Sequence, residues 1–482
     1  MTGIASATNN NIIDTPEQRY LKYKETAEKY KIIQLGLVTW HMTSPNNFIA
    51  NPYTIYLFPL HHQDDSMLFC ELSSMIFNRN QGSIDFNKWI YQGVPYLNDK
   101  QYKKLYADII DDNINLYNPE NKDEVREVFP HNPADIKKCD DIIKDIMENF
   151  ILQKKLKEYL IEKVPKFMLY YIVNHLPAGI KNNLFISVLT LKKGKKVFLL
   201  TKVNQEEKEK MFKEEIENQL NLLSTTQKGV KNIYDALIEK KSILVGHNIS
   251  LDILFLLSHF GPQLPTSYLA FKELISQNFK YLFDTKIIYE EYQKVSDIKH
   301  VADTHSVLDQ MYPLLRSLHE KDVKITLQIK NGKEISYHNA GYDAYITGSV
   351  FLYLKNAYGD KIEQNFKNKI FIMKALYKNF NIDNKTEEEE KLIEGSYIYS
   401  LRANHSKKTS DIDITQILGE NVYSKLPHKM FVADNYNALI LMIVFDNKIL
   451  TKENFESTLN KYKKIFTWYS IEEFRRITRK NK

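Results

Sequence analysis

The stretch SILVGHNISLDILFLLSHF, at residues 242–260, contains the pattern that decides the fold. Its first five residues have the apolar character of a buried strand, HN is typical of a turn, and the remainder is typical of an apolar helix. Asp252 falls in the first turn of that helix. Open α/β sheets bind ligands just beyond the carboxyl ends of their strands, so the stretch predicts an α/β fold with a site at Asp252. Two interpretations of Asp252 stay open: a carboxylate stabilised by the helix dipole, and a metal ligand.

A second stretch, SYHNAGYDAYITG at residues 336–348, places a histidine and a carboxylate at the start of another apolar helix. Asp343 falls in the first turn, where the helix dipole again offers a structural explanation. His338 precedes it on the same approach to the helix. Such a pair can share one site, in which the histidine takes a proton from water and the aspartate holds a cation.

The composition is that of a globular protein large enough for two or three domains, with 482 residues, 43% hydrophobic and 26% charged. A formal net charge of +6 is compatible with an acidic partner such as RNA. The two cysteines, Cys70 and Cys139, have neither metal nor disulfide spacing, which favours a reducing compartment, either the cytoplasm or the nucleus. No apolar run is long enough to cross a bilayer, so we expect no membrane association.

Helix and strand patterns alternate along the chain. In order, they predict a helix at 14–30, strands at 31–40 and 53–60, a helical segment at 131–176, a hairpin within 184–203 and a helix at 204–220. The acidic run at 385–391 is typical of a linker, and the chain ends in the basic sequence RRITRKNK. The hairpin and the helices around it look like a small module inserted into a larger domain.

The motifs HNAGYDAYITG, LVGHNISLD and LFDTK closely resemble nuclease motifs of the poly(A)-specific ribonuclease family, which are 3′-to-5′ deadenylases of the DEDD superfamily. DTPEQRY, IQLGLVTW and DFNKWIYQGVPYLN resemble its early segments, in the right order, and the similarity covers most of residues 1–375. The resemblance implies an RNase H-like nuclease domain, a mixed sheet with helices on both faces, that uses two divalent metal ions. The spacing of His338 and Asp343 matches the histidine subclass, because Asn339 stands where the tyrosine subclass carries tyrosine.

Carried over by motif, the resemblance implies specific roles for individual residues. Asp252 and Asp343 would bind Mg²⁺, and His338 would be the general base. Four further residues would line the path of the 3′-terminal nucleotides: Lys286, Asn248, Leu251 and Ile4. For each of these four residues a structural explanation stays open. Lys286 can be a solvated lysine at a strand end and Asn248 a turn residue, while Leu251 and Ile4 can be core residues.

The start of the chain departs from the family pattern. The family's first motif is Asp-x-Glu followed by an apolar or aromatic residue, Ser or Thr, Gly and Ile, whereas this sequence begins MTGI. Both acids, and the central strand that carries them, are therefore missing, and a strand-wide gap is expected between the strands at 31–40 and 242–246. We expect a truncated sequence rather than a true pseudo-nuclease, because loss of a central strand would expose two strand edges to water. The second metal ion is expected only where the first motif is present.

The resemblance also implies a domain layout. The nuclease domain would comprise residues 1–132 and 206–380, with an inserted small α/β module at 133–205 and a C-terminal α/β domain at 392–482. The family has a nucleic-acid-binding domain in place of the insert, but the segment KFMLYYIVNHL lacks its Arg-x-x-x-His signature. The C-terminal domain faintly resembles the family's RNA-recognition motif, although no stacking aromatic residues can be assigned in it.

The implied activity is Mg²⁺-dependent shortening of single-stranded RNA at poly(A) 3′ ends, with release of 5′-AMP, by a homodimer. A related branch of the family trims small silencing RNAs and typically carries a membrane-spanning tail, so the deadenylase branch is the better match. The rival hypothesis is a non-catalytic RNA-binding or scaffold protein built on a decayed nuclease.

Overall fold

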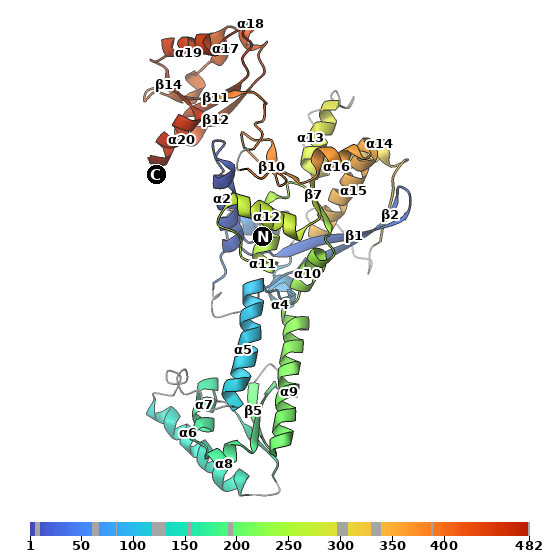
Figure 1. Cartoon of the computed structure of the whole chain (residues 1–482), viewed down its shortest axis with the longest axis vertical. Coiled ribbons are helices and arrows are strands. Elements are labelled where there is room, and N and C mark those ends of the chain that lie inside the picture. Colours follow the sequence, from blue (N-terminus) through green and yellow to red (C-terminus); the bar gives the residue numbers. More distant parts are fainter. Residues whose placement is uncertain are drawn as a thin grey trace. The chain divides into compact units, whose positions relative to one another are not determined.

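The computed structural model describes residues 1–4, 10–59, 67–82, 84–117, 132–152, 156–162, 164–190, 196–295, 307–328, 339–386 and 389–480. As predicted, the fold is mixed α/β, with several sheets and many helices (Figure 1). The chain forms two compact units, one of residues Met1–Asn98 and Val230–Lys482 and the other of residues Asp99–Gly229. Among the helices in the described ranges, none combines the length and hydropathy needed to span a bilayer.

The first unit contains two sheets before residue 382. Its elements are α2 (Pro16–Lys29), β1 (Gln34–Ser44), β2 (Asn47–Tyr56), α3 (Leu72–Asn80), α4 (Phe86–Gln92), α10 (Lys231–Glu239), β6 (Ile243–Gly246), α11 (Ser250–Phe260), α12 (Tyr268–Asn278), β7 (Tyr281–Asp284), α13 (Thr285–Val295), α14 (Leu308–His319), β8 (Lys324–Leu327), α15 (Ala340–Tyr358), α16 (Lys361–Phe366), β9 (Lys369–Phe371) and β10 (Asn379–Asn381). The sheet orders are β1-β2-β8 and β10-β9-β7-β6, and both sheets contain parallel and antiparallel pairs.

Strands β1 and β6 each lie at the edge of their own sheet. Within the described part of the chain they are not hydrogen-bonded to each other, and the expected strand-wide gap between them stays a prediction. The pattern of residues 242–246 predicts a buried strand, but β6 is half-exposed, with Ile243 46% exposed. The reason is its edge position, since β7 covers only one side of it.

Helix α15 packs against β1, β2 and β6 and thereby contacts strands of both sheets. The contact is close at Gly36, where an added Cβ would lie 1.8 Å from the Ala340 carbonyl oxygen. Asn339 caps the helix by accepting from the Gly341 amide at 3.1 Å, and the same amide also lies 3.2 Å from Thr54 Oγ1. These contacts hold the first turn of α15, which carries Asp343, against the hairpin of β1 and β2.

Helix α11 is buried on most sides in an apolar core that it shares with α2, α12, Leu282 of β7 and Ile370 of β9. His259 lies in this core, 4% exposed, with its Nδ1 3.0 Å from the Phe255 carbonyl oxygen and its ring packed near Tyr96. Burial lowers the pKa of His259 to about 3. The imidazole is therefore neutral in the fold at physiological pH.

We expect the free energy of unfolding of the His259→Phe protein to fall less on acidification than that of the wild-type protein. Between pH about 6.5, where an unfolded histidine titrates, and pH about 3, the unfolded chain binds a proton at His259 that the folded chain does not. This difference makes the free energy of unfolding fall as the pH falls through that window, and a phenylalanine ring, which does not titrate, cannot contribute to it. Urea unfolding of both proteins at pH 4.5 and 7.5 measures the effect. Identical pH dependences would show that His259 is not buried in its neutral form.

The second unit has its own core. Its elements are α5 (Asp99–Tyr117), α6 (Pro133–Asp145), β3 (Glu158–Ile161), α7 (Lys166–His175), α8 (Ala178–Lys181), β4 (Leu184–Thr190), β5 (Lys196–Lys202) and α9 (Gln205–Leu222). The predicted hairpin is confirmed as β4 and β5, and β3 completes an antiparallel sheet in the order β3-β5-β4. Helices α5 and α9 lie side by side (Figure 1).

The C-terminal part of the first unit contains a four-stranded antiparallel sheet in the order β12-β13-β11-β14. Its elements are β11 (Tyr397–Ala403), α17 (Ile414–Leu418), α18 (Glu420–Tyr423), β12 (His428–Ala433), β13 (Ala438–Ile443), α19 (Lys452–Lys461), β14 (Phe466–Ser470) and α20 (Ile471–Lys480). Strand β13 is buried along its whole length, because both faces of the sheet are covered. One face packs on α17 and α19, and the other packs on α20 and on Ile12, Ile13 and Leu376.

Candidate active site

The candidate site lies at the carboxyl ends of β6 and β7. These strands are parallel, and Gly246, the last residue of β6, is paired with Asp284, the last residue of β7. Carboxyl ends of neighbouring parallel strands meet at one edge of a sheet, so the loops that follow them are brought together. The loop after β6 leads into α11 and Asp252, and the loop after β7 leads directly into α13 and Lys286.

The Asp284 carboxylate connects three backbone segments at this edge. It accepts from the amides of Asn248 at 2.8 Å, Ile249 at 3.1 Å, Lys286 at 3.1 Å and Phe371 at 3.0 Å. The residue is 1% exposed, and burial raises its pKa while the four amide donors act in the opposite direction. Asp284 therefore fixes the turn before α11 and so the position from which Asp252 projects.

Asn248 is the turn residue of this arrangement. Its φ of 55° lies in the left-handed region, which asparagine adopts more readily than most residues. Its backbone amide is bonded to Asp284, so the structural explanation of Asn248 has direct support. Next to it, His247 Nδ1 lies 3.0 Å from Thr285 Oγ1, which in turn donates to the Gly246 carbonyl.

Asp252 projects from the first turn of α11 and is exposed as a residue. Its carboxyl group nevertheless has enough protein around it to lose part of its hydration, and this desolvation raises the pKa of Asp252 to about 6. The charge of Asp284 raises it further, and the Met1 amino group acts in the opposite direction. A surface carboxylate that is costly to ionise and lies beside a second carboxylate is a natural position for a cation.

Residues 1–4 enter the same region. The Thr2 amide donates to the Lys31 carbonyl at 2.8 Å, and the Lys31 amide donates to Thr2 Oγ1 at 2.9 Å, so the segment runs beside the start of β1. Ile4 is half-buried and its amide donates to Glu71 Oε2 at 2.8 Å. Burial lowers the pKa of the Met1 amino group to about 6, while the charge of Asp252 raises it. The Met1 amino group and Asp252 therefore lie close enough to interact electrostatically, whereas the position of Ile4 beside the site stays a prediction.

The structure also locates the other predicted residues. Lys286 is half-buried, with its Nζ 4.6 Å from the centre of the Phe371 ring, and Leu251 packs against the large core as a partly buried residue. Asp343 is half-buried in the first turn of α15, and its amide donates to the Asn339 carbonyl at 2.9 Å. His338 lies outside the described residues. The roles assigned to all seven residues stay predictions.

A divalent cation fits Asp252 and Asp343 only as part of a larger ligand set. Within the described ranges, which exclude His338, no group of three or more His, Cys, Asp or Glu side chains could hold a metal ion. Mg²⁺ commonly takes one or two carboxylates and completes its shell with water and substrate phosphates. Asp252 in the first turn of α11 and Asp343 in the first turn of α15 could each supply one carboxylate in this mode of binding.

Sequence reasoning missed the function of Asp284. The residue is visible in the LFDTK motif, but its pattern is that of any acidic strand end, and its amide partners come from segments as distant as Phe371. The signal that could have identified it is a carboxylate as the last residue of a buried apolar strand. Such a residue must find donors, and at the carboxyl end of a parallel strand the nearest donors belong to the loops of the site.

Replacing Asp284 by asparagine is expected to loosen the turn before α11. The new NH₂ group cannot accept hydrogen bonds, so we expect the free energy of unfolding to fall by about 3 kcal/mol. Each carboxylate oxygen accepts from two amides, so hydrogen exchange should accelerate at the pair that faces the NH₂ group, either Asn248 with Lys286 or Ile249 with Phe371, but not at Gly341, whose bonds are made elsewhere. Unchanged exchange at the four amides would contradict the role of Asp284.

The fold and the site together define an α/β protein with an acidic site at the carboxyl ends of parallel strands. Comparison with protein families places it more narrowly, because the model of the CAF1 family ribonucleases matches residues 1–351. The chain therefore belongs to the CAF1 ribonuclease family.

Individual relatives confirm the resemblance to poly(A)-specific ribonucleases. Poly(A)-specific ribonuclease PARN of Xenopus laevis is 26% identical over 402 residues, which cover 78% of this chain and 62% of that protein. The human PARN is 25% identical over 408 residues, covering 77% of this chain and 61% of that protein. The human poly(A)-specific ribonuclease PNLDC1 is 26% identical over 358 residues, covering 71% and 64%. The chain thus spans less than two thirds of the length of each of these relatives.

Proposed function

We propose that this protein is a 3′-to-5′ exoribonuclease that shortens poly(A) tails and releases 5′-AMP. The family match over residues 1–351 carries the proposal, and it is supported by the position of Asp252 beside the carboxyl ends of β6 and β7. The relatives named poly(A)-specific ribonuclease suggest the substrate. We propose an RNase H-like nuclease domain interrupted by the module at 133–205, and action in the cytoplasm or nucleus as a homodimer.

In the proposed reaction each residue has a limited task. Asp252 and Asp343 would hold the divalent cation, for which Mg²⁺ is the expected ion. When bound, such an ion acidifies a water molecule and stabilises negative charge on the attacked phosphate and the leaving oxygen. His338 would accept the proton of the attacking water. Asp284 keeps the Asn248 turn in place, and Lys286 offers a positive charge near it.

We propose an RNA-recognition-motif-like architecture for residues 392–482. The element order β11-α17-α18-β12-β13-α19-β14, with two short helices in place of one between β11 and β12, and the strand order β12-β13-β11-β14 support this assignment. The face of the sheet away from α17 and α19, however, carries Ile398, Ile440 and Met442, and these side chains are buried under α20 and the segment containing Ile13. Among the described residues of that face, the central strands β11 and β13 thus offer RNA bases only covered apolar side chains, and the aromatic residues Phe431 and Tyr469 on the edge strands are half-buried.

The proposed activity is tested with 5′-labelled A₂₀ RNA and Mg²⁺. We expect stepwise shortening from the 3′ end, with AMP as the released nucleotide and no reaction in EDTA. An RNA of the same length that ends in a 3′-phosphate serves as a control for attack from the 3′ end. If the chain binds A₂₀ but leaves it intact in Mg²⁺ and Mn²⁺, the exonuclease proposal is wrong and the RNA-binding alternative is favoured.

A further inference from the structure

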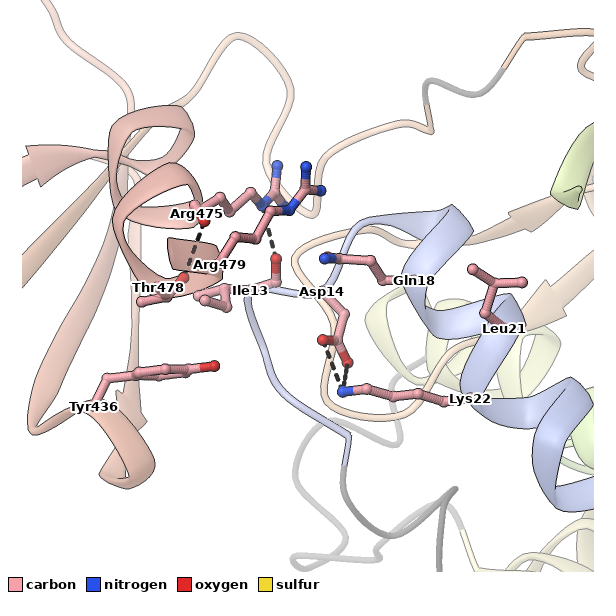
Figure 2. Close-up of a pocket in the computed structure, with 9 residues that line it drawn as sticks. All are labelled: Ile13, Asp14, Gln18, Leu21, Lys22, Tyr436, Arg475, Thr478 and Arg479. Atoms are coloured by element: carbon pink, nitrogen blue, oxygen red, sulfur yellow. Dashed lines mark hydrogen bonds and ion pairs between the residues drawn. The ribbon is translucent and has the colours of Figure 1, made fainter. Parts of the chain in front are cut away.

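A cationic cavity lies where α20 meets the segment that leads into α2 (Figure 2). It has a volume of about 200 Å³ and includes none of the residues assigned above to the active site. Three cationic side chains line it, Lys22, Arg475 and Arg479, against a single carboxylate, Asp14. The cavity is therefore positively charged overall.

The carboxylate of Asp14 is already neutralised by its neighbours. Asp14 is 7% exposed, and its Oδ2 lies 2.8 Å from Lys22 Nζ and 3.3 Å from Arg19 Nε. It also accepts from the Asn11 amide at 2.8 Å. Thr15 caps α2, so the Asp14 side chain is not used as the helix cap and takes part in this ion-pair cluster.

The charge of Arg475 has no comparable compensation. Its Nε donates to the Ile13 carbonyl at 2.7 Å and its Nη2 donates to the Tyr377 hydroxyl at 3.1 Å, and both acceptors are neutral. Among the described carboxylates, none forms an ion pair with Arg475 or Arg479. Arg475 is therefore a cation fixed in position by neutral bonds.

Arg479 lies one helical turn after Arg475 on the same side of α20 and is exposed. Figure 2 shows the two guanidinium groups close together at one side of the cavity with the Gln18 amide nitrogen near them, while the Tyr436 hydroxyl lies at the opposite side. Two guanidinium groups with a neutral amide donor near them match a phosphate group, which accepts paired N–H donors.

We propose that this cavity binds a backbone phosphate of the RNA at a point away from the cleavage site. The identity of the ligand rests on the proposed function, since RNA is the polyanion that a ribonuclease must hold. Because the central strands of the outer face of the C-terminal sheet are covered, the domain would contact RNA through this cavity and not through base stacking on those strands. The site would read phosphate and not base, so its contribution should be equal for different sequences.

The test measures RNA binding in EDTA, so that no hydrolysis occurs, with labelled A₂₀ and U₂₀ and the full 482-residue chain. We expect Arg479→Ala to weaken binding of both RNAs about tenfold and to reduce the salt dependence by about one phosphate contact. Arg476→Ala is the matched control, because Arg476 is exposed on the same helix but does not line the cavity. Its effect should stay below about twofold, and Arg479→Lys should be intermediate.

Equal affinities of the Arg479→Ala and Arg476→Ala proteins would overturn the proposal, and the exonuclease proposal would be unaffected. Conversely, wild-type protein that binds A₂₀ without shortening it would refute the exonuclease proposal. The comparison of Arg479→Ala with Arg476→Ala would still test whether this cavity binds RNA. A last experiment measures the thermal unfolding of the wild-type and Arg479→Ala proteins with and without inorganic phosphate. Stabilisation by phosphate that Arg479→Ala abolishes, together with unchanged RNA affinities, would overturn RNA as the ligand and assign the cavity to free phosphate.

Discussion

Asp252→Asn is expected to reduce the rate of RNA shortening on the order of 10³-fold, while the affinity for A₂₀ does not fall. The carboxylate projects from the first turn of α11 beside the carboxyl ends of β6 and β7, where it would hold the cation. An amide of the same size keeps the shape of the site but supplies no negative charge. Single-turnover cleavage of labelled A₂₀ at saturating protein measures the change.

The same substitution separates the two interpretations of Asp252. If the helix dipole were its function, Asp252→Asn would lower stability by up to about 1 kcal/mol. Because the pKa of Asp252 is raised to about 6, its ionised form instead costs stability above that pH, so the metal-free variant should be at least as stable at pH 7.5. Asp309→Asn is the matched control, since Asp309 lies in the first turn of α14 and is exposed. It should leave cleavage unchanged.

Lys272→Met is expected to lower the free energy of unfolding by about 4 kcal/mol, because it leaves the Glu389 charge buried without its partner. Lys272 Nζ lies 2.6 Å from Glu389 Oε1, and the two side chains are 3% and 1% exposed. Lys272 also donates to the Asn384 and Thr386 carbonyls, and Glu389 accepts from the Tyr268 hydroxyl and the Asn381 amide. Burial and the neighbouring Glu389 raise the pKa of Tyr268, which therefore stays protonated.

Two further variants test whether the loss in Lys272→Met comes from an unpaired buried charge. The double substitution of Lys272→Met with Glu389→Gln removes both charges and keeps one acceptor oxygen for either Tyr268 or Asn381, so it should recover part of the loss. Arg316→Met breaks an exposed ion pair with Glu320 and should cost no more than about 0.5 kcal/mol. Denaturant unfolding at pH 7 compares the three. A loss for Lys272→Met as small as that for Arg316→Met would mean that the pair is hydrated.

The site-bearing elements could be predicted from local sequence. β6 and α11 follow from the apolar run around Asp252, and the start of α15 follows from Asn339 and Gly341 before an apolar helix. Both signals are short-range, since a strand, a turn and an N-cap are each specified within a few residues. The half-exposure of β6 was not predictable in the same way, because it depends on which strands lie beside it.

Local sequence patterns could not predict the contacts between segments that are distant along the chain. The acidic run at 385–391 predicts a solvated linker, but Glu389 is 7% exposed and pairs with Lys272 from α12. Local charge density cannot show this partner, which is more than a hundred residues away. For the same physical reason the four amides around Asp284 and the cluster of Asp14 with Arg19 and Lys22 became visible only in the folded chain.

The central claim is that Asp252 and Asp343, from α11 and α15, share one divalent cation. Crystals of the chain grown with Mn²⁺, whose anomalous scattering marks the ion directly, test it without reference to activity. We predict one Mn²⁺ peak coordinated by carboxylate oxygens of both residues, and its disappearance in Asp343→Asn crystals. A structure in which the two carboxylates point to separate surfaces, or in which Mn²⁺ binds without either of them, would contradict the account.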